Sequence, residues 1–493
     1  MITRIKIDGF KSLLDTELYF GPFTCIAGAN AVGKSNFFDA LMFLSKLADN
    51  SVIQAAKSIR SENQRHSNIR DIFFKSGKEY YDRIYFEVDM LVPKTAEDDL
   101  GQMAEATITS LRYTLTLQLN DENSEKEPIE IIKEELLPNK LMETKQHIFF
   151  SANKNWIKSV LLGRRAGTPF ISTDKDKIRL HQDGNKGRTT EFIAEKMPRT
   201  LLSTVTAESP TAFLARQEMR NWMMLQFEPS ALRQPNSIFE VKNAEITANG
   251  SNLPATLFRL HNEKKQVDVY QSLTNKVKGL VSDVDEISID KDEKRDLLTL
   301  QIKFKDGLLL PAQSLSDGTL RFLGLAIIQE DNESSGLICL EEPENGINPK
   351  KVEEMVELLT QMATDTDYAV DEDNPLRQVI INSHSPIVVS KVPFESLYLA
   401  KEKESYIEKF NKKVKYTSFS ALRLTWKTKN NLAEVTSLGE INAYLSKSSS
   451  EAILDQAIVR DEAMEYVRNE SSKKSRYART VAQHIQQLTL DLK

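Results

Sequence analysis

The sequence predicts an α/β protein that combines a mixed parallel core sheet with an antiparallel side sheet. Two short, wholly apolar runs, residues 336–340 and 379–381, are typical of strands buried on both faces of a parallel sheet, and a helix expected over 350–362 connects them. Residues 84–90 and 111–119 instead alternate apolar and polar side chains. This alternation indicates half-buried strands that pair as antiparallel neighbours.

Length and composition predict a soluble, cytoplasmic protein of two or three domains. The chain has 493 residues, of which 40% are hydrophobic and 28% charged, with a formal net charge of −6. Cys25 and Cys339 both lie in apolar runs, which indicates buried thiols in a reducing compartment. The N-terminus carries no secretion signal and no run of about 18 apolar residues occurs, so we expect no membrane contact.

One loop matches the phosphate-binding pattern G-x-x-x-x-G-K-[ST] in full, in the sequence Gly-Ala-Asn-Ala-Val-Gly-Lys-Ser. Its glycines let backbone amides point at phosphates, and the helix that follows directs its positive N-terminus at the same anion. We expect Lys34 to reach the β- and γ-phosphates of ATP and the Ser35 hydroxyl to ligate Mg²⁺. The candidate nucleotide-binding residues are Gly28, Asn30, Gly33, Lys34, Ser35 and Asn36.

Three further motifs carry candidate site residues. Glu341 and Glu342 end the apolar run at 336–340, where one carboxylate can hold Mg²⁺ and the next can polarise the attacking water; we assign Glu341 to the metal and Glu342 to the water. His384 follows the second apolar run and is a candidate contact to the γ-phosphate. Ser316 and Gly318 begin a helix and form a candidate anion site. For His384 and the Ser316 turn, the residues alone leave a structural role open.

Together these motifs resemble an ABC-class ATPase of the RecF, SMC and OLD group. The subgroup that they resemble most is the stand-alone prokaryotic AAA-type ATPases with Glu-Glu-Pro-Glu and Ser-His-Ser-Pro motifs, such as those of the anti-phage systems Septu and PARIS. Two stretches, Ser-Ala-Leu-Arg-Gln-Pro and Asn-Gly-Ser-Asn-Leu-Pro, also resemble that subgroup. In chain order, the matching stretches are 7–12, 28–36, 230–235, 249–254, 315–319, 340–349 and 382–386.

The resemblance implies a composite site shared by two subunits. Ser316 and Gly318 would contact the γ-phosphate of ATP held by the partner, residues 345–348 would lie at that interface, and His384 would be the switch residue. The sequence departs from the pattern in two places, because Glu341 stands where an aspartate is usual and Asp317 where transporter ATPases have glycine. For the glutamine of the Q-loop, the candidates are Gln54 and Gln64.

The resemblance also divides the chain. We expect an ATPase lobe with the phosphate loop over 1–120, a compact and mainly helical insertion over 121–285, a second ATPase lobe over 286–425, and a helical tail over 426–493. The insertion lacks the heptads of an SMC coiled coil. No D-x-D pair follows residue 390, so we expect no built-in Toprim nuclease.

The leading hypothesis is an ATP-hydrolysing, ATP-gated sensor or regulator in anti-phage defence. ATP would close a head-to-tail dimer or higher oligomer, hydrolysis would open it, and a separately encoded nuclease or other effector would act. The alternative is a RecF/SMC-like DNA clamp in repair or chromosome maintenance. For that role, residues 154–199, including Trp156, Arg164 and Arg165, form a candidate basic nucleic-acid window. A transporter ATPase subunit is a third hypothesis, which the long insertion disfavours.

Overall fold

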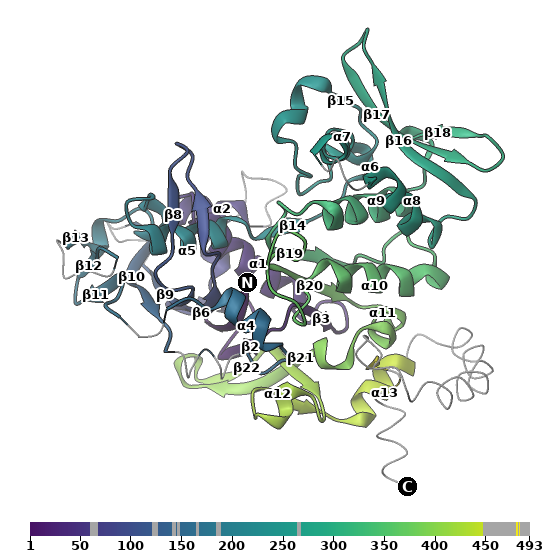
Figure 1. Cartoon of the computed structure of the whole chain (residues 1–493). Coiled ribbons are helices and arrows are strands. Elements are labelled where there is room, and N and C mark those ends of the chain that lie inside the picture. The colour runs from purple at the N-terminus through teal and green to yellow at the C-terminus, as the bar shows by residue number, and fades with distance from the viewer. Residues whose placement is uncertain are drawn as a thin grey trace.

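Figure 1 shows a central sheet, a second large sheet at its side, and a smaller sheet at the upper corner of the view. Among the described residues, none of the helices is both long and apolar enough to cross a membrane. The computed structural model describes residues 1–59, 68–120, 127–140, 144, 148–163, 167–183, 189–263, 268–446, 480, 481 and 483.

The central sheet has seven strands in the order β14-β19-β20-β3-β21-β22-β23. All neighbours are parallel except β21 and β22, which form an antiparallel hairpin. The two apolar runs of the sequence are therefore confirmed as parallel neighbours, β19 and β20. The bounds are β3 Phe23–Ala27, β14 Met223–Leu225, β19 Gly336–Glu341, β20 Arg377–Ser383, β21 Leu397–Ile407, β22 Lys412–Leu422 and β23 Glu434–Thr436.

The central sheet is buried on both faces, because successive side chains of one strand enter different cores. Cys339 and Ile380 pack on the face that contacts α1 (Lys34–Leu47) and the side sheet. Ile338 and Ile381 pack on the opposite face. That face is covered by α9 (Asp317–Glu330), α10 (Val352–Met362) and α11 (Pro386–Lys391). Cys25 and Cys339 are buried free thiols, as predicted, and burial raises the pKa of both.

The side sheet has eight antiparallel strands in the order β13-β12-β11-β10-β9-β6-β1-β2. The predicted pairing of 84–90 with 111–119 is confirmed, because β6 and β9 pair along their length. The bounds are β1 Ile2–Asp8, β2 Thr16–Tyr19, β6 Arg83–Leu91, β9 Ser110–Leu119, β10 Ile129–Pro138, β11 Ile171–Asp174, β12 Lys177–Leu180 and β13 Thr190–Ile193.

A smaller sheet lies beside α9 and contains a hairpin that turns at Asp306-Gly307, with Gly307 at φ 87°. Its strands are β15 Asn236–Ser237, β16 Val284–Asp292, β17 Leu297–Phe304 and β18 Leu309–Pro311. Among the described residues, the remaining α-helices and short strands are α2 Val52–Ser58, α4 Lys154–Val160, α5 Pro210–Arg220, α6 Pro229–Leu232, α7 Leu253–Glu263, α8 Val269–Lys278, α12 Trp426–Lys429, α13 Leu438–Ser446, β4 Lys75–Ser76, β5 Glu79–Tyr80, β7 Thr95–Glu97 and β8 Met103–Glu105.

The described part of 121–285 contains the helices α4 to α8, but it does not form the separate compact insertion that the sequence predicts. Its strands β10 to β13 extend the side sheet, and β14 joins the central sheet, while α7 and α8 pack against the smaller sheet. The physical reason is that β9 presents an open edge, whose unpaired backbone groups β10 satisfies. In the tail, β23 likewise adds a strand to the central sheet. The segment boundaries remain predictions.

Glu134 on β10 makes stability depend on pH. Its buried carboxyl accepts hydrogen bonds from the amides of Leu201 (2.6 Å) and Leu202 (2.9 Å) and the hydroxyl of Tyr113 (3.2 Å). Burial outweighs these bonds and raises the pKa of Glu134 from 4.5 to about 7. Between these values the folded state keeps a proton that the unfolded state has lost. Stability therefore falls as pH rises from about 4.5 to about 7.

Between pH 5 and pH 8, we expect Glu134→Gln to reduce the loss in the free energy of unfolding by on the order of 2 kcal/mol. Urea unfolding at the two pH values measures it. The matched control is Glu135→Gln on the same strand, which should keep the pH dependence of the wild type. An unchanged slope in Glu134→Gln would show that another group causes the fall.

Candidate nucleotide-binding site

The phosphate loop connects β3 to α1, in the strand–loop–helix order that the sequence predicts. Ala31 (φ 65°) and Gly33 (φ 94°) adopt left-handed backbone conformations, which turn the loop tightly into the helix. The N-cap of α1 is Gly33, which has no side chain to cap the helix. The helix dipole favours negative charge at this N-terminus.

A hydroxyl cluster supports the loop from behind. Thr417 on β22 donates a hydrogen bond to the carbonyl of Val32 (2.8 Å), and its hydroxyl lies 2.6 Å from that of Ser12. The side-chain amide of Asn36 donates a hydrogen bond to the Ser12 hydroxyl (2.8 Å). Ser12 is the last residue of the 7–12 motif stretch. Its contacts show that this stretch ends beside the phosphate loop. Thr417 lies outside every motif, so the sequence offered no signal for it.

We expect Thr417→Val to weaken ATP binding by about three- to tenfold, because the hydroxyl contacts to Val32 and Ser12 that fix the loop are both lost. Thr417→Ser keeps the hydroxyl and should stay near wild type. Titration calorimetry with ATP measures both. The matched control is Thr436→Val, which breaks a similar buried hydroxyl pair between Thr436 and Ser420 (2.7 Å) elsewhere in the same sheet. An equal loss in this control would indicate general weakening of the sheet.

Lys34 lies close to the acidic end of β19. Its ammonium donates to the carbonyls of Gly28 (2.7 Å) and Ala29 (2.8 Å). Burial lowers the pKa of Lys34, and the carboxylates of Glu342, Glu341 and Glu344 oppose that shift. The loop lysine and the predicted acidic residues therefore meet at one edge of the central sheet, where the carboxyl ends of β3, β20 and β19 lie together.

Glu342 is the most constrained of these acids. It adopts a left-handed backbone (φ 47°), which is uncommon for a residue other than glycine and typical of functional sites. One carboxylate oxygen lies 2.6 Å from Nδ1 of His384, and the other accepts from the side chain of Asn345 (3.0 Å). Burial raises the pKa of Glu342, but these bonds and the charges of His384 and Lys34 outweigh it and hold the pKa below its usual value.

Glutamates at and just after the end of β19 fix the turn that contains His384. Asn382 donates to Glu341 (3.1 Å), and Ser383 donates to Glu344 (2.5 Å). The Ser383 hydroxyl also accepts from the amide of Ser385 (2.9 Å), which closes the turn. Burial raises the pKa of Glu344. The sequence analysis gave Glu344 no role, yet its carboxyl fixes the histidine-bearing turn.

Ser316 and Gly318 lie at the start of α9. The exposed Ser316 is the N-cap, and among the described residues its hydroxyl bonds to Thr319 alone. Gly318 is buried against the 345–348 loop, since a Cβ at this position would lie 2.2 Å from the carbonyl oxygen of Gly346. The N-cap role that the sequence left open is therefore present. The exposed face of the turn stays available to another molecule.

The structure adds Gln226 as a candidate site residue that no sequence pattern indicates. Gln226 follows β14, whose carboxyl end lies beside that of β19. With Glu341 and Glu342, it lines a cavity of about 320 Å³. The predicted candidate Gln54 is engaged in a capping box with Ser51 at the start of α2. Gln64 lies outside the described residues.

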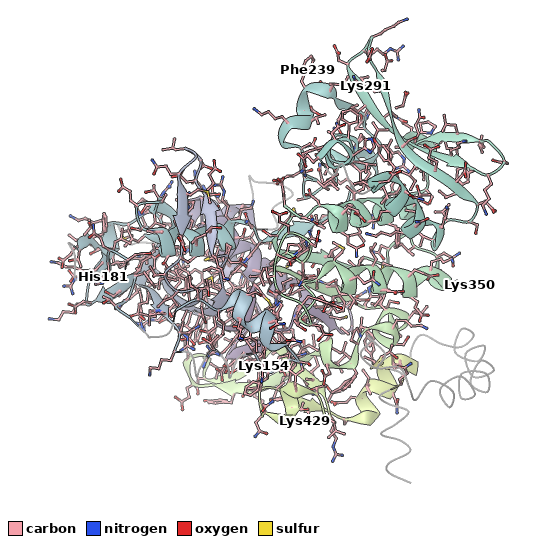
Figure 2. The ribbon with its side chains drawn as sticks, viewed as in Figure 1. Lys154, His181, Phe239, Lys291, Lys350 and Lys429 are labelled. Atoms are coloured by element: carbon pink, nitrogen blue, oxygen red, sulfur yellow. The ribbon has the colours of Figure 1, made fainter. Side chains whose placement is uncertain are left out.

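The basic window at 154–199 does not form one patch in the described residues. Trp156 is buried in a hydrophobic core, and Lys177 and Arg179 are both paired with Glu191 (2.9 and 2.7 Å). Figure 2 shows Lys154 on α4 and His181 at the far end of the side sheet, well apart. Arg164 and Arg165 lie outside the described residues.

Ser35 and Glu341 offer the hydroxyl and carboxylate oxygens that Mg²⁺ prefers. Glu341 is positioned by Asn382, and the Glu341 charge acts on Lys34, which places the carboxylate beside the loop. In the part of the chain that the structure describes, no cluster of three or more His, Cys, Asp or Glu side chains is arranged to hold a metal. This donor set fits Mg²⁺, which commonly takes one or two protein ligands and completes its shell with phosphates and water.

The family described as "AAA domain, putative AbiEii toxin, Type IV TA system" matches residues 23–95 and 104–390, more than half of the chain. The chain belongs to this family. Its AAA-domain assignment confirms the P-loop ATPase family that the motifs resemble. The matched range includes the phosphate loop, the acidic strand end and His384. No curated protein matches the chain in sequence.

Several solved structures of SMC heads are remotely similar, each at 12% identity. An SMC head bound to the C-winged helix domain of ScpA has a TM-score of 0.42 and covers 85% of this chain and 98% of its own. The SMC head domain from Thermotoga maritima has a TM-score of 0.35, with 86% and 99% covered. An Smc head with an extended coiled coil, bound to the C-terminal domain of ScpA from Pyrococcus furiosus, has a TM-score of 0.41, with 87% and 99% covered.

Proposed function

We propose that this AAA-domain protein binds and hydrolyses ATP, and that ATP closes two copies of the chain head to tail. The observation that carries the proposal is the Glu342 carboxylate, held by His384 and Asn345 at the end of β19, close to Lys34 of the phosphate loop. A phosphate loop binds a triphosphate, and a fixed carboxylate beside it can orient water for attack on the γ-phosphorus.

In this proposal each residue has a defined task. The loop amides and Lys34 hold the β- and γ-phosphates. The Glu342 carboxylate is ionised at neutral pH and is fixed by His384 and Asn345, so it can orient the attacking water and take up its proton as the bond to phosphorus forms. His384 contacts the γ-phosphate and links its presence to the position of Glu342. Gln226 reaches the same space from β14. Ser35 and Glu341 would hold Mg²⁺, which neutralises charge on the phosphates during transfer.

The turn formed by residues 315–319 at the start of α9, called the signature turn below, supports a second copy of the chain as the partner. Ser316 is exposed at the N-terminus of α9, where a helix favours an anion, and Gly318 brings the turn against Gly346. These residues would contact the γ-phosphate bound by the partner copy, which makes the ATP site complete only in the assembled pair. Release of phosphate would remove the shared contact and open the pair.

For the wider role we propose an ATP-gated regulator of anti-phage defence in the cytoplasm, acting with a separately encoded nuclease effector. The family description, which names a toxin of a type IV toxin–antitoxin system, is compatible with this role, and the nuclease effector is proposed from the resemblance of the motifs. The alternative is a DNA clamp that uses the 154–199 window. The pairing of Lys177 and Arg179 with Glu191 disfavours it, since it reduces the charge available for phosphates.

Sedimentation velocity of Glu342→Gln with ATP tests the assembly. We expect a dimer or higher oligomer with ATP and separate chains with ADP. Ser316→Arg in the same background should abolish assembly, because the large side chain blocks the signature turn. The matched control is Ser335→Arg, at an exposed serine beyond the other end of α9. Separate chains of Glu342→Gln at saturating ATP would refute the proposal.

A further inference from the structure

Two unexplained sequence features meet at the signature turn. Asp317 stands beside Ser316 where transporter ATPases have glycine, and Arg233 belongs to the 230–235 stretch. One terminal nitrogen of Arg233 donates to the Asp317 carboxylate (2.5 Å) and to the carbonyl of Leu315 (2.9 Å). The guanidinium therefore contacts the residues on both sides of Ser316.

The charge of Asp317 conflicts with the proposed task of the turn. An aspartate in the first turn of a helix favours the helix dipole, but it repels a phosphate that approaches the same N-terminus. The Asp317 side chain is 52% exposed, so it stands on the surface that would face the partner's triphosphate. A counter-charge at this point is needed for the turn to accept an anion, and Arg233 supplies it.

The segment that carries Arg233 is anchored independently of the ion pair. The amides of Gln226 and Glu228 donate to the carbonyls of Ala248 (2.8 Å) and Asn249 (2.9 Å), which joins this segment to the 249–254 stretch. Arg233 therefore arrives at the turn from a fixed position. Exposed ion pairs contribute little to stability. A role at the phosphate-facing surface explains the pair better than a contribution to folding.

We propose that Arg233 is a positioning residue of the composite ATP site. It neutralises Asp317 and fixes the Leu315–Asp317 turn, so that Ser316 can face the triphosphate of the partner copy. This inference deepens the proposed function and rests on it. Arg233 acts on the triphosphate only through the turn. If residue 317 is neutral, the positive charge of Arg233 is no longer needed for the turn to accept an anion.

The test compares variants in the Glu342→Gln background by sedimentation with ATP. We expect Arg233→Gln to raise the dimer dissociation constant about tenfold or more, because an uncompensated like charge then faces the phosphates. The double variant Arg233→Gln with Asp317→Asn should recover to within about threefold of its parent. Arg295→Gln is the matched control, since it breaks a distant surface pair with Asp292 (3.8 Å). Circular dichroism and ATP titration of the separate chains check that each variant is folded.

The outcomes separate the two proposals. If the Glu342→Gln parent does not assemble with ATP, the proposed function fails and this inference falls with it. If the parent assembles and Arg233→Gln assembles equally well, only the role of Arg233 is overturned. A double variant that stays as weak as Arg233→Gln also overturns it, because neutralisation of Asp317 would then not be the cause.

Discussion

Glu342→Gln lowers the rate of ATP hydrolysis by about a hundredfold or more and leaves a protein that still binds ATP. The amide keeps the size of the side chain, but it cannot accept a proton from the attacking water. Because the lowered pKa of Glu342 keeps the wild-type carboxylate ionised, the loss should persist across the neutral pH range. Single-turnover phosphate release measures the chemical step, and calorimetry measures ATP affinity.

The matched control for this variant is Glu357→Gln on the exposed face of α10, which should hydrolyse ATP at the wild-type rate. Hydrolysis by Glu342→Gln within about threefold of wild type would contradict the assignment. Another group would then have to orient the water, and Glu341, Glu344 and Gln226 are alternatives at this end of the sheet.

Gly33→Ala removes most ATP binding. Gly33 has φ 94°, and a Cβ on it would lie 2.1 Å from the Thr417 hydroxyl and 2.4 Å from that of Ser12. The backbone conformation alone costs about 1–2 kcal/mol for a residue other than glycine, or roughly five- to thirtyfold in affinity, and the clash adds to it. The loop must move to relieve both. Calorimetric titration with ATP should therefore show a dissociation constant raised by at least about thirtyfold.

Gly307→Ala is the matched control, because it introduces the same backbone strain without a clash and away from the phosphate loop. Gly307 has nearly the same backbone angle (φ 87°), but a Cβ there meets nothing within 4 Å, and the residue lies in the β17–β18 turn. We expect it to lose a little stability and no ATP affinity. If Gly33→Ala binds ATP as well as this control does, the rigid support of the loop by Thr417 and Ser12 is not needed for binding.

The sequence predicted the parts of the fold that local patterns encode. The phosphate loop, the apolar strands β19 and β20 and the alternating strands β6 and β9 each lie within one short stretch. The strands β11 to β13 have four residues each, and β10 contains a register shift near Ile131, so their alternation is too short or too irregular to recognise. The sequence therefore did not reveal these strands within residues 121–285.

The candidate site was predictable where motifs define it and hidden where distant segments meet. Lys34, Glu342 and His384 follow from their motifs, and the structure brings them together. Thr417 supports Val32 from 385 positions away, and no pattern in one sequence links the two. Gln226 follows a strand of only three residues, which is too short for a sequence pattern to reveal, so the sequence points to Gln54 and Gln64 instead.

The close approach of Gly318 and Gly346 has a mechanical consequence. Because no side chain lies between the two backbones, the first turn of α9 packs directly against the loop that follows β19. The carbonyl of Asn345 also accepts from Arg321 of α9 (3.1 Å), while its side chain bonds to Glu342. We therefore expect a tilt of α9 to reach the Glu342 carboxylate through Asn345, so that contact of α9 with a neighbouring molecule would change the position of that carboxylate.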